Sequence, residues 1–357
     1  MNKKKFIIAS GGTGGHFYPG LAVGRTLKEK GHAVLFFVRK KDISIEALKK
    51  YDLPYQEIDL TGLPRSFNPV RHVQFLYKLA TSLVSTYRFI KNFHPDVAFG
   101  TGGYITFPLI VCARLQQVPT ALHDSNSRLG LSNKICGRFA TLFLLGLPID
   151  RPFKNAKLVG TPLRKEFSRF VDRAQTLQKL GLSTQKPVVL VMGGSQGAKG
   201  LNQAVVTLAS EMPQLQFIHL TGTRWFDLLK EKYKNCPNVY PLAYCHEIHT
   251  LMKSADLTIC RSGAGTIAEL IACQLPAICV PFPHAAADHQ YYNAKILAEI
   301  GAADIVREGK NLSFQLQELL PTKTPQVLQQ MRESYKRVPI PNPLTAAQQI
   351  VALLEDL

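Results

Sequence analysis

The sequence lacks the cysteine spacing of a zinc site or a dithiol redox motif. Its 357 residues include seven cysteines, an odd number, and no two of them form a Cys-x-x-Cys pair, so we expect reduced thiols in the cytosol. The chain also has no uninterrupted apolar stretch of the roughly 18 residues that cross a bilayer. The apolar residues that follow Met1 are too few for a secretory signal. Any membrane contact is therefore expected to be peripheral.

Acidic residues are scarce relative to basic ones. Asp and Glu total 25 against 43 Lys and Arg, which gives a formal charge of +18. Such a charge favours anionic partners: nucleotides, diphosphates, nucleic acid or acidic lipid headgroups. The basic residues are scattered, without the basic and aromatic clusters of an RNA-binding protein, so we expect no nucleic acid partner.

The hydrophobic content, 46% over 357 residues, is sufficient for two globular domains. The apolar run 6–10 leads into a glycine turn and a helical pattern, and the run from Val188 repeats this arrangement about half the chain later. Short apolar runs alternate with helical patterns, as in parallel doubly wound sheets. We predict an α/β fold of two Rossmann-like domains, residues 1–160 and 161–340. Segment 341–357, which follows several prolines, is expected to form a helix that crosses back to the first domain.

Three glycine-rich turns each follow an apolar strand: Gly11–Gly15, Gly100–Gly103 and Gly193–Gly197. Unpaired backbone N–H groups and the helix dipole attract phosphate at such turns, and glycine lets the backbone approach the anion closely. One turn alone can be a mere tight connection. Three turns at strand ends favour anion-binding sites.

Two nucleotide-binding motifs are missing. The dinucleotide fingerprint G-x-G-x-x-G starting at Gly12 would need glycine where Phe17 stands, and the strand 34–38 runs into Arg39-Lys40-Lys41, which supplies no acid for a ribose. Neither domain-opening turn has the Lys-Ser/Thr pair of a P-loop. Dehydrogenases and P-loop ATP enzymes are thus disfavoured.

A further strand and turn, Cys260 to Gly265, lead to Glu269 about one turn into a helix. This carboxylate can accept the two hydroxyls of a ribose, or it can simply stabilise the helix dipole, and both interpretations stay open. His284 and His289 lack the companion carboxylates of a zinc site, and no paired acid for Mn²⁺ or Mg²⁺ is present. We therefore expect metal-independent chemistry and no cofactor.

Five motifs occur in a characteristic order: Gly11-Gly-Thr-Gly-Gly-His16-x-x-Pro19, Gly102-Gly-Tyr104, Gly193-Gly-Ser-Gln-Gly-Ala198, Arg261-Ser-Gly-Ala264 and Asp288-His-Gln290. With them the sequence resembles the MurG family of peptidoglycan glycosyltransferases, nearly end to end. The resemblance implies the GT-B arrangement, two Rossmann-like domains with an interdomain cleft. It also implies inverting transfer of N-acetylglucosamine from UDP-N-acetylglucosamine to undecaprenyl-diphospho-N-acetylmuramoyl-pentapeptide (lipid I), giving lipid II. This step of cell wall synthesis, linked to cell shape and division, takes place at the cytoplasmic face of the inner membrane.

The resemblance also implies a donor site, mostly in the second domain. It places Ser195 and neighbouring amides at the diphosphate, Gln290 at the sugar and the backbone of Cys245 at the uracil. The full set of implied donor contacts is Thr13, Gly14, Gly15, Asn126, Arg164, Ser195, Gln196, Cys245, Ala264, Gly265, Thr266, Glu269 and Gln290.

For the acceptor diphosphate the resemblance implies a site in the first domain, made by Gly14, Gly15, Gly102, Gly103 and Tyr104. His16 is then the leading general base, because inversion requires deprotonation of the acceptor hydroxyl and imidazole titrates near neutral pH. A helix cap or a phosphate contact is the alternative role for His16. The sequence departs from the family pattern at residues 123–126. Many relatives have His-Glu-Gln-Asn there, and this chain has His-Asp-Ser-Asn.

A long helix is predicted between Asn68-Pro69, an N-cap and first-turn proline, and His94-Pro95. Its broad apolar stripe is expected to face the core and consists of Val73, Leu76, Tyr77, Ala80, Leu83, Val84, Tyr87 and Ile90. A second stripe, Phe75, Leu79, Phe89 and Phe93 with Arg71 and Lys78 at its border, is expected to dock on an anionic membrane. Burial of the helix on both sides is the alternative.

Two other functions remain open at this stage. A UDP-sugar transferase with another lipid acceptor, such as diacylglycerol, would share the frame and the glycine turns. A protein of another class, one that binds nucleotide sugars or nucleic acid without catalysis, would also fit the +18 charge.

Overall fold

The computed structural model describes residues 3–12, 14–42, 44–64, 68–194 and 196–357. It divides the chain into two compact units, Met1–Arg164 with Ile340–Leu357, and Lys165–Pro339. The sequence places the first boundary at 160 and the return at 341. The first unit thus contains both ends of the chain, and each unit is described by itself below.

The first unit is built on a parallel sheet with the strand order β3-β2-β1-β4-β5-β6-β7. The strands β1 and β4 are almost entirely apolar and buried, as expected for a sheet covered on both faces. The strands are β1 Lys5–Ala9, β2 Ala33–Arg39, β3 Tyr55–Ile58, β4 Val97–Gly100, β5 Thr120–Asp124, β6 Leu142–Leu145 and β7 Ala156–Leu158. The helices are α1 Gly14–Glu29, α2 Ser44–Lys50, α3 Pro69–Phe93, α4 Thr106–Leu115, α5 Leu131–Cys136 and α14 Ala346–Glu355.

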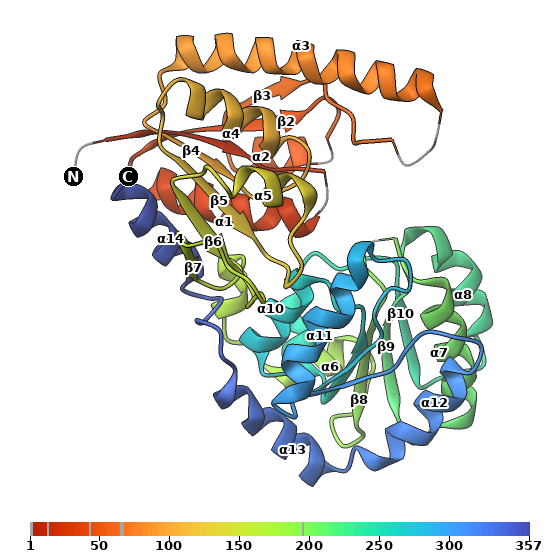
Figure 1. Cartoon of the computed structure of the whole chain (residues 1–357). Coiled ribbons are helices and arrows are strands. Elements are labelled where there is room, and N and C mark those ends of the chain that lie inside the picture. Colours follow the sequence, from red (N-terminus) through yellow and green to blue (C-terminus); the bar gives the residue numbers. More distant parts are fainter. Residues whose placement is uncertain (1–2, 13, 43, 65–67, 195) are drawn as a thin grey trace. The chain divides into compact units, whose positions relative to one another are not determined.

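Helices cover both faces of this sheet (Figure 1). One core lies between the strands and the helices α1, α2 and α14, and includes Leu21, Leu48 and Ile350. The core on the opposite face includes Leu109 of α4 and Ile90 of α3. Each face is therefore closed by helices from different parts of the chain.

The second unit repeats this plan with the strand order β10-β9-β8-β11-β12-β13. The strands are β8 Val188–Met192, β9 Gln216–Leu220, β10 Val239–Leu242, β11 Leu257–Cys260, β12 Ala277–Cys279 and β13 Ala303–Ile305. The α-helices are α6 Arg173–Lys179, α7 Lys199–Glu211, α8 Phe226–Lys232, α9 Ile248–Ser254, α10 Ala264–Cys273, α11 His289–Glu299, α12 Leu312–Leu319 and α13 Pro325–Ser334. Short 3-10 helices are η1 Lys165–Ser168, η2 Thr223–Trp225, η3 Ala286–Asp288, η4 Leu320–Thr322 and η5 Tyr335–Arg337. The predicted class, two parallel-sheet α/β domains, is confirmed.

Each sheet contains a topological switch point. In the first unit β1 pairs with β2 on one side and β4 on the other, and in the second unit β8 lies between β9 and β11 in the same way. The connections on the two sides of such a strand run in opposite directions, which opens a crevice at the carboxyl ends of the strands. The glycine turns that follow β1, β4 and β8 all lie at these two points.

The C-terminal helix α14 is tied to the first unit by polar contacts. Glu355 accepts hydrogen bonds from His32 Nε2 at 2.8 Å and from Lys30 Nζ at 2.6 Å. The Nδ1 atom of His32 accepts the backbone N–H of Lys4 at 3.2 Å. The side chain of His32 is almost fully buried, so both of its nitrogens are satisfied inside the unit.

The helix α3 begins and ends where the sequence predicts. The side chain of Asn68 accepts a hydrogen bond from the N–H of Val70 at 3.0 Å, and Pro69 occupies the first turn. At the other end His94 has a left-handed conformation, with a φ of 50°, and its N–H bonds to the carbonyl of Ile90. Both caps follow from the residue types at these positions.

The faces of α3 are largely the reverse of those predicted. Most of the stripe expected to face the core is exposed, with 66%, 61% and 71% exposure at Val73, Leu76 and Tyr77, and Ala80, Val84 and Tyr87 are exposed as well; Leu83 is half-buried and Ile90 is buried. The second stripe, Phe75, Leu79, Phe89 and Phe93, is half-buried.

The reason for this reversal lies in small polar residues. The buried positions of α3 are Ser82, Thr86 and Ile90, and α3 packs on α4. Short Ser and Thr side chains let the two helices approach closely, and Phe89 and Phe93 then pack beside this contact. A count of apolar residues alone points to the wider stripe and misses such a contact.

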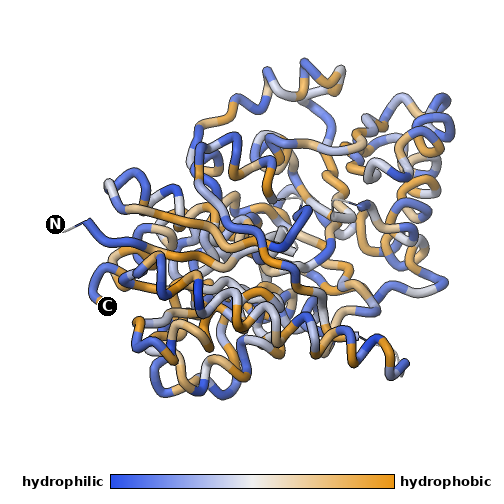
Figure 2. Tube along the Cα trace, turned by 90° about the horizontal axis from the view of Figure 1, so that it is seen from above, coloured by the Kyte–Doolittle hydropathy of each residue, from blue (hydrophilic) through white to orange (hydrophobic). Residues whose placement is uncertain are grey.

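Hydrophobic and hydrophilic segments alternate along the whole trace (Figure 2). Among the described residues, no helix combines the length and the hydrophobicity that crossing a membrane requires.

Candidate functional site

The first glycine turn is held in place by Asp42. Its carboxylate accepts the N–H of Gly12 at 2.9 Å, and also that of Ser44 at 3.0 Å. Asp42 is buried and follows β2, the neighbour of β1. Gly12 has a φ of +83°, which only glycine adopts readily. Asp42, the first acid after β2, thus stabilises the glycine turn. Thr13 lies outside the described residues.

His16 stands in the first turn of α1, beside the turn that follows β4. Its Nδ1 lies 3.1 Å from the carbonyl oxygen of Thr101. A carbonyl can only accept, so Nδ1 carries the proton and the lone pair of the neutral ring is on Nε2. The backbone carbonyl of His16 accepts the hydroxyls of Ser10 at 3.0 Å and Thr101 at 2.8 Å. Position and tautomer of the ring are both set by this packing.

Gly102 leaves the space in which the His16 ring lies. It has a φ of +100°, and a Cβ added there would be 2.8 Å from His16 Nδ1. Gly103 also has a positive φ, of +78°. Tyr104 is partly exposed and its ring lies against Gly62. The predicted acceptor residues Gly14, Gly15, Gly102, Gly103 and Tyr104 thus lie at the switch point beside His16.

Asp124 organises the loop in which the sequence departs from the common pattern. Its carboxylate accepts the backbone N–H of Asn126 at 3.0 Å and of Gly130 at 3.1 Å, and the side-chain amide of Asn133 at 3.0 Å. The predicted donor residue Asn126 is half-buried in this loop. The shorter carboxylate of Asp thus makes a complete set of loop contacts here.

His123, just before this loop, is fully buried. Its Nε2 donates to the carbonyl of Gly160 at 3.0 Å. Burial lowers the pKa of His123, so the ring is neutral at physiological pH. His123 therefore supports the end of β5 and is not placed to exchange protons with solvent.

Arg164 ends the first of the two segments that make up the first unit. Its guanidinium lies 5.1 Å from the centre of the Tyr18 ring, in α1. The predicted donor contacts are thus divided: Gly14, Gly15, Asn126 and Arg164 belong to the first unit, and the other described ones to the second.

The second glycine turn, Gly193–Gly197, follows β8. Gly197 has a φ of +72°, and a Cβ there would lie 2.0 Å from the carbonyl oxygen of Thr221 in the turn after β9. Glycine is therefore required by close backbone packing. Gln196 is exposed in this turn, and Ser195 lies outside the described residues.

The helix α10 presents its N-terminus at the switch point of the second sheet. Its N-cap residue is Gly263, which has no side chain to cap it, so the first N–H groups, around Ala264, Gly265 and Thr266, are suited to bind an anion. Glu269 is half-buried one turn further along. Cys245, half-buried, lies in the loop after β10.

Gln290 connects two loops at this end of the sheet. Its Oε1 accepts the N–H of Phe282 at 3.0 Å, and its backbone carbonyl accepts the hydroxyl of Ser262 at 2.8 Å. Asn293 donates to the carbonyl of Ser262 at 3.1 Å. The start of α11 is thereby fixed to the turn that follows β11.

Two domains of one known family match the sequence. The N-terminal domain of glycosyltransferase family 28 matches residues 6–144, and the C-terminal domain of the same family matches residues 188–342. A protein of Elusimicrobium minutum is 46% identical over 360 residues, covering 99% of this chain and all of the relative. It is named UDP-N-acetylglucosamine–N-acetylmuramyl-(pentapeptide) pyrophosphoryl-undecaprenol N-acetylglucosamine transferase.

The chain belongs to the MurG family of glycosyltransferases. A Thermoanaerobacter protein with the same name is 31% identical over 369 residues, covering 99% of this chain and all of the relative. The crystal structure of Acinetobacter baumannii MurG superposes with a TM-score of 0.81 at 28% identity, over 99% of this chain and all of that one. A calicheamicin glycosyltransferase, at 13% identity and a TM-score of 0.73 over 100% and 98% of the two chains, shares the fold.

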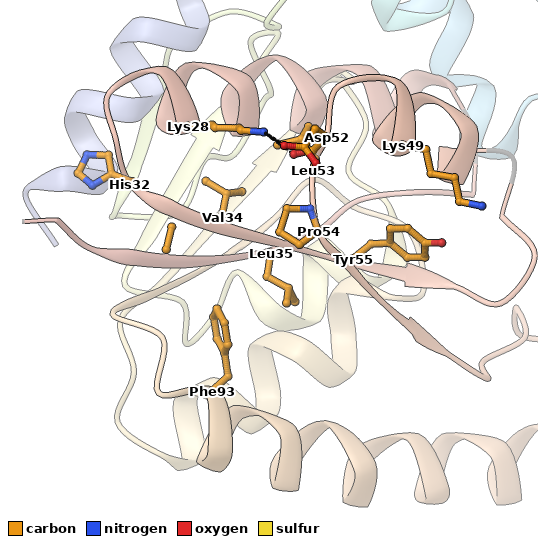
Figure 3. A pocket seen from close by; sticks show the side chains of 11 residues that line it. Lys28, His32, Val34, Leu35, Lys49, Asp52, Leu53, Pro54, Tyr55 and Phe93 are labelled. Carbon is orange, nitrogen blue, oxygen red and sulfur yellow. Dashed lines mark hydrogen bonds and ion pairs between the residues drawn. The ribbon is translucent and has the colours of Figure 1, made fainter.

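Within this MurG-family fold, a pocket of about 900 Å³ lies away from the glycine turns (Figure 3). It is lined by the start of β2, with Val34 and Leu35, and by Phe93 at the end of α3. Lys28, one of the two lysines that line it, is paired with Asp52 at 2.9 Å. Parallel sheets bind ligands at the carboxyl ends of their strands, so we do not place the site in this pocket.

The described residues contain no group of three or more His, Cys, Asp or Glu side chains suited to hold a metal ion. Metal independence stays a prediction, because no observation tests it.

Three supporting residues were not found from the sequence of this MurG-family chain. Each of them bonds to a residue in another strand end or loop. The pairs are Asp42 with Gly12, Asn133 with Asp124, and Arg307 with Asp288. The only local signal was for Asp42, an acid just after β2. The Arg307 contact follows from the pairing of β12 with β13, and the Asn133 contact from the fold of the loop between β5 and α5.

Proposed function

We propose that the chain transfers N-acetylglucosamine from UDP-N-acetylglucosamine to lipid I, with inversion at the anomeric carbon, and so forms lipid II for peptidoglycan synthesis. The observation that supports this most strongly is the 46% identity, over the full length of both chains, with a relative whose name states that transfer. The two switch points agree with it, because donor and acceptor each carry a diphosphate and each unit offers a glycine turn at a helix N-terminus.

His16 acts as the general base in this proposal. Its Nδ1 donates to Thr101, which leaves Nε2 to take the proton from the acceptor hydroxyl as that oxygen attacks the anomeric carbon. The backbone carbonyl of Thr101 takes the orienting position that a carboxylate has in hydrolase triads. The alternative, a phosphate contact by His16, predicts weaker acceptor binding in place of slower chemistry.

The acceptor diphosphate is proposed to bind at the N-terminus of α1. The first turn of this helix has no acidic residue, and Gly14 and Gly15 present only backbone to an approaching anion. The turn of Gly102 and Gly103, with Tyr104, forms the other side of this site. Backbone N–H groups at a helix N-terminus suit the two negative charges.

The donor is proposed to bind in the second unit, at the uncapped N-terminus of α10. Ala264, Gly265 and Thr266 meet the phosphates, Glu269 the ribose and Gln290 the sugar. Ser195 and Gln196 add diphosphate contacts, and the backbone of Cys245 meets the uracil. From the first unit, Thr13, Gly14, Gly15, Asn126 and Arg164 complete the donor contacts. Helix N-termini and the Arg164 guanidinium stabilise the leaving UDP without a metal ion.

The exposed apolar side of α3 is proposed to dock on the anionic membrane that carries the lipid acceptor, at the cytoplasmic face. This side consists of Val70, Val73, Leu76, Tyr77, Val84 and Tyr87, all more than 40% exposed. Arg71 is exposed on the same helix, and Lys78 is paired with Asp59 at 3.0 Å. An apolar helix face with cations around it is suited to the interface between headgroups and acyl chains.

Release of UDP tests the proposed transfer. Purified protein is given UDP-N-acetylglucosamine with a lipid I analogue, with diacylglycerol, or with no acceptor, each in the presence of EDTA. We expect release only with the lipid I analogue. Release with diacylglycerol alone would contradict the acceptor, and release that EDTA abolishes would contradict metal independence.

A further inference from the structure

The loop after β13 contacts two separate donor-side segments through adjacent residues. Glu308 accepts a hydrogen bond from Arg261 at 2.5 Å, and both side chains are largely buried. Arg307 binds both carboxylate oxygens of Asp288, at 3.1 and 2.8 Å. Its guanidinium also lies 4.0 Å from the centre of the Tyr291 ring. No motif of the sequence includes Arg307.

The segment that Arg307 holds has an unusual backbone. Ala287 and Asp288 are consecutive residues with left-handed conformations, with φ values of 52° and 51°. The left-handed conformation is unfavourable for residues other than glycine, so the turn needs stabilisation from its surroundings. The planar guanidinium supplies it, because a bidentate pair and a stacked ring fix both the position and the direction of Asp288.

This turn determines where Gln290 lies, two residues further on. Since Oε1 of Gln290 already accepts the N–H of Phe282, its side-chain NH₂ is the group that can donate to a sugar hydroxyl. A shift of the 287–288 turn would rotate the first turn of α11 and move this amide. Positioning of this kind is sensitive to displacements of about 1 Å.

We propose that Arg307 is a positioning residue for recognition of the donor sugar: through Asp288 and Tyr291 it holds the start of α11 so that the Gln290 amide meets the pyranose of the UDP-sugar. This inference rests on the proposed function. According to it, Arg307 supports the contact with the sugar, and not the contacts with the uridine or the diphosphate.

The test compares binding of UDP and of UDP-N-acetylglucosamine by calorimetry in the wild type, Arg307→Ala and Lys295→Ala. Lys295 is an exposed cation of α11 paired with Glu299 at 3.2 Å, so its removal changes the charge equally without touching the turn. We expect Arg307→Ala to raise the Kd for UDP-N-acetylglucosamine about 5- to 10-fold, up to about 1.4 kcal/mol, and to leave the Kd for UDP within about twofold. Lys295→Ala should change neither.

Equal weakening of both ligands in Arg307→Ala, or no change in either, would overturn the proposal. If Arg307→Ala does not fold, Asp288→Asn decides, because Asn tolerates the left-handed backbone but loses the charge pair. It should weaken UDP-N-acetylglucosamine selectively as well, and raise KM for the donor with little change in kcat. A wild type that binds neither ligand would contradict the proposed function itself. If the wild type is an active transferase and Arg307→Ala leaves both Kd values unchanged, only this inference is contradicted.

Discussion

At the scale of single residues, neighbouring backbone groups set the position and the tautomer of the His16 ring. The carbonyl of Thr101 orients Nδ1, and Gly102 leaves room for the ring. The proton on Nδ1 is held by this carbonyl, so the lone pair of the neutral ring is on Nε2. The geometry therefore fits the proposed role of His16 as a general base that acts through Nε2.

His16→Ala should lower kcat by about 10²- to 10⁴-fold, the usual contribution of a general base, and leave the Kd for UDP-N-acetylglucosamine within about twofold. Turnover and calorimetry measure the two effects. His94→Asn is the control, because Asn tolerates the left-handed C-cap of α3 at which His94 stands. Undiminished kcat in His16→Ala would exclude the base role.

Gly102→Ala should reduce turnover at least about tenfold and destabilise the fold by about 1–2 kcal/mol. The added Cβ would lie 2.8 Å from His16 Nδ1 and the φ of +100° strains an L-residue. Gly130→Ala is the matched control, because no atom lies within 4 Å of its added Cβ. Kinetics and thermal unfolding distinguish the two; equal activity of both variants would show that the His16 ring needs no such space.

The residues that act through backbone were predictable from the sequence, and those that act through distant partners were not. The first glycine turn and His16 form one continuous motif, and the other two glycine turns each follow an apolar strand, so local sequence is sufficient to predict phosphate sites there. Asp42 accepts the N–H of Gly12 across the neighbouring strands β2 and β1, and only the order of the strands brings these two residues together. Asn133 of α5 donates to Asp124 at the end of β5, and this contact depends on how the loop between them folds. Arg307 depends in the same way on the fold.

At the scale of elements, α3 illustrates what a helical pattern determines. Asn68, Pro69 and His94 fix its ends through local hydrogen bonds, which sequence describes well. Its orientation depends on how closely α4 can approach, and the small residues Ser82 and Thr86 decide that. The two apolar stripes were therefore recognised, but their faces were largely exchanged.

Charging the exposed side of α3 should release the protein from membranes. Leu76→Glu with Tyr77→Glu should weaken binding to phosphatidylglycerol vesicles at least about tenfold, because the apolar area lost is worth a few kcal/mol. The melting temperature should hardly change. Co-sedimentation and thermal unfolding provide the two measurements.

Phe89→Glu is the companion variant, since Phe89 is half-buried and packs against the core of the first unit. It should instead destabilise the fold by about 2 kcal/mol or more. If the double variant Leu76→Glu with Tyr77→Glu unfolds, or binds vesicles as the wild type does, the proposed docking surface is contradicted.

At the scale of the whole molecule, both units use one strand order, and the C-terminal helix completes the first unit. The repeat of strand, glycine turn and helix was sufficient to predict two parallel sheets. The return of the last helix was only suggested by prolines, since its anchor is the pairing of Glu355 with Lys30 and His32, far away in sequence.

This anchor makes stability depend on pH. Burial opposes the charge of Glu355, but the hydrogen bonds from Lys30 and His32 outweigh it and hold the pKa of Glu355 below its ordinary 4.5. A lowered pKa stabilises the fold above pH 4.5, and the contribution is lost as the pH falls through the folded value. Glu355→Gln should therefore cost about 1 kcal/mol at pH 7 and progressively less on acidification.

Urea unfolding at several pH values measures this difference. Asp52→Asn is the control, because it removes the exposed pair with Lys28 and keeps a residue that tolerates the φ of 49°. A penalty for Glu355→Gln that grows towards low pH would show that the sign is wrong.

The product of the reaction tests the central claim most directly. The wild-type protein is incubated with UDP-N-acetylglucosamine and a lipid I analogue, and the lipid product is isolated for mass spectrometry and NMR of the anomeric proton. We predict one added N-acetylglucosamine in β-linkage, inverted relative to the α-linked donor. No added sugar, or an α-linkage, would contradict an inverting N-acetylglucosamine transferase that acts on lipid I.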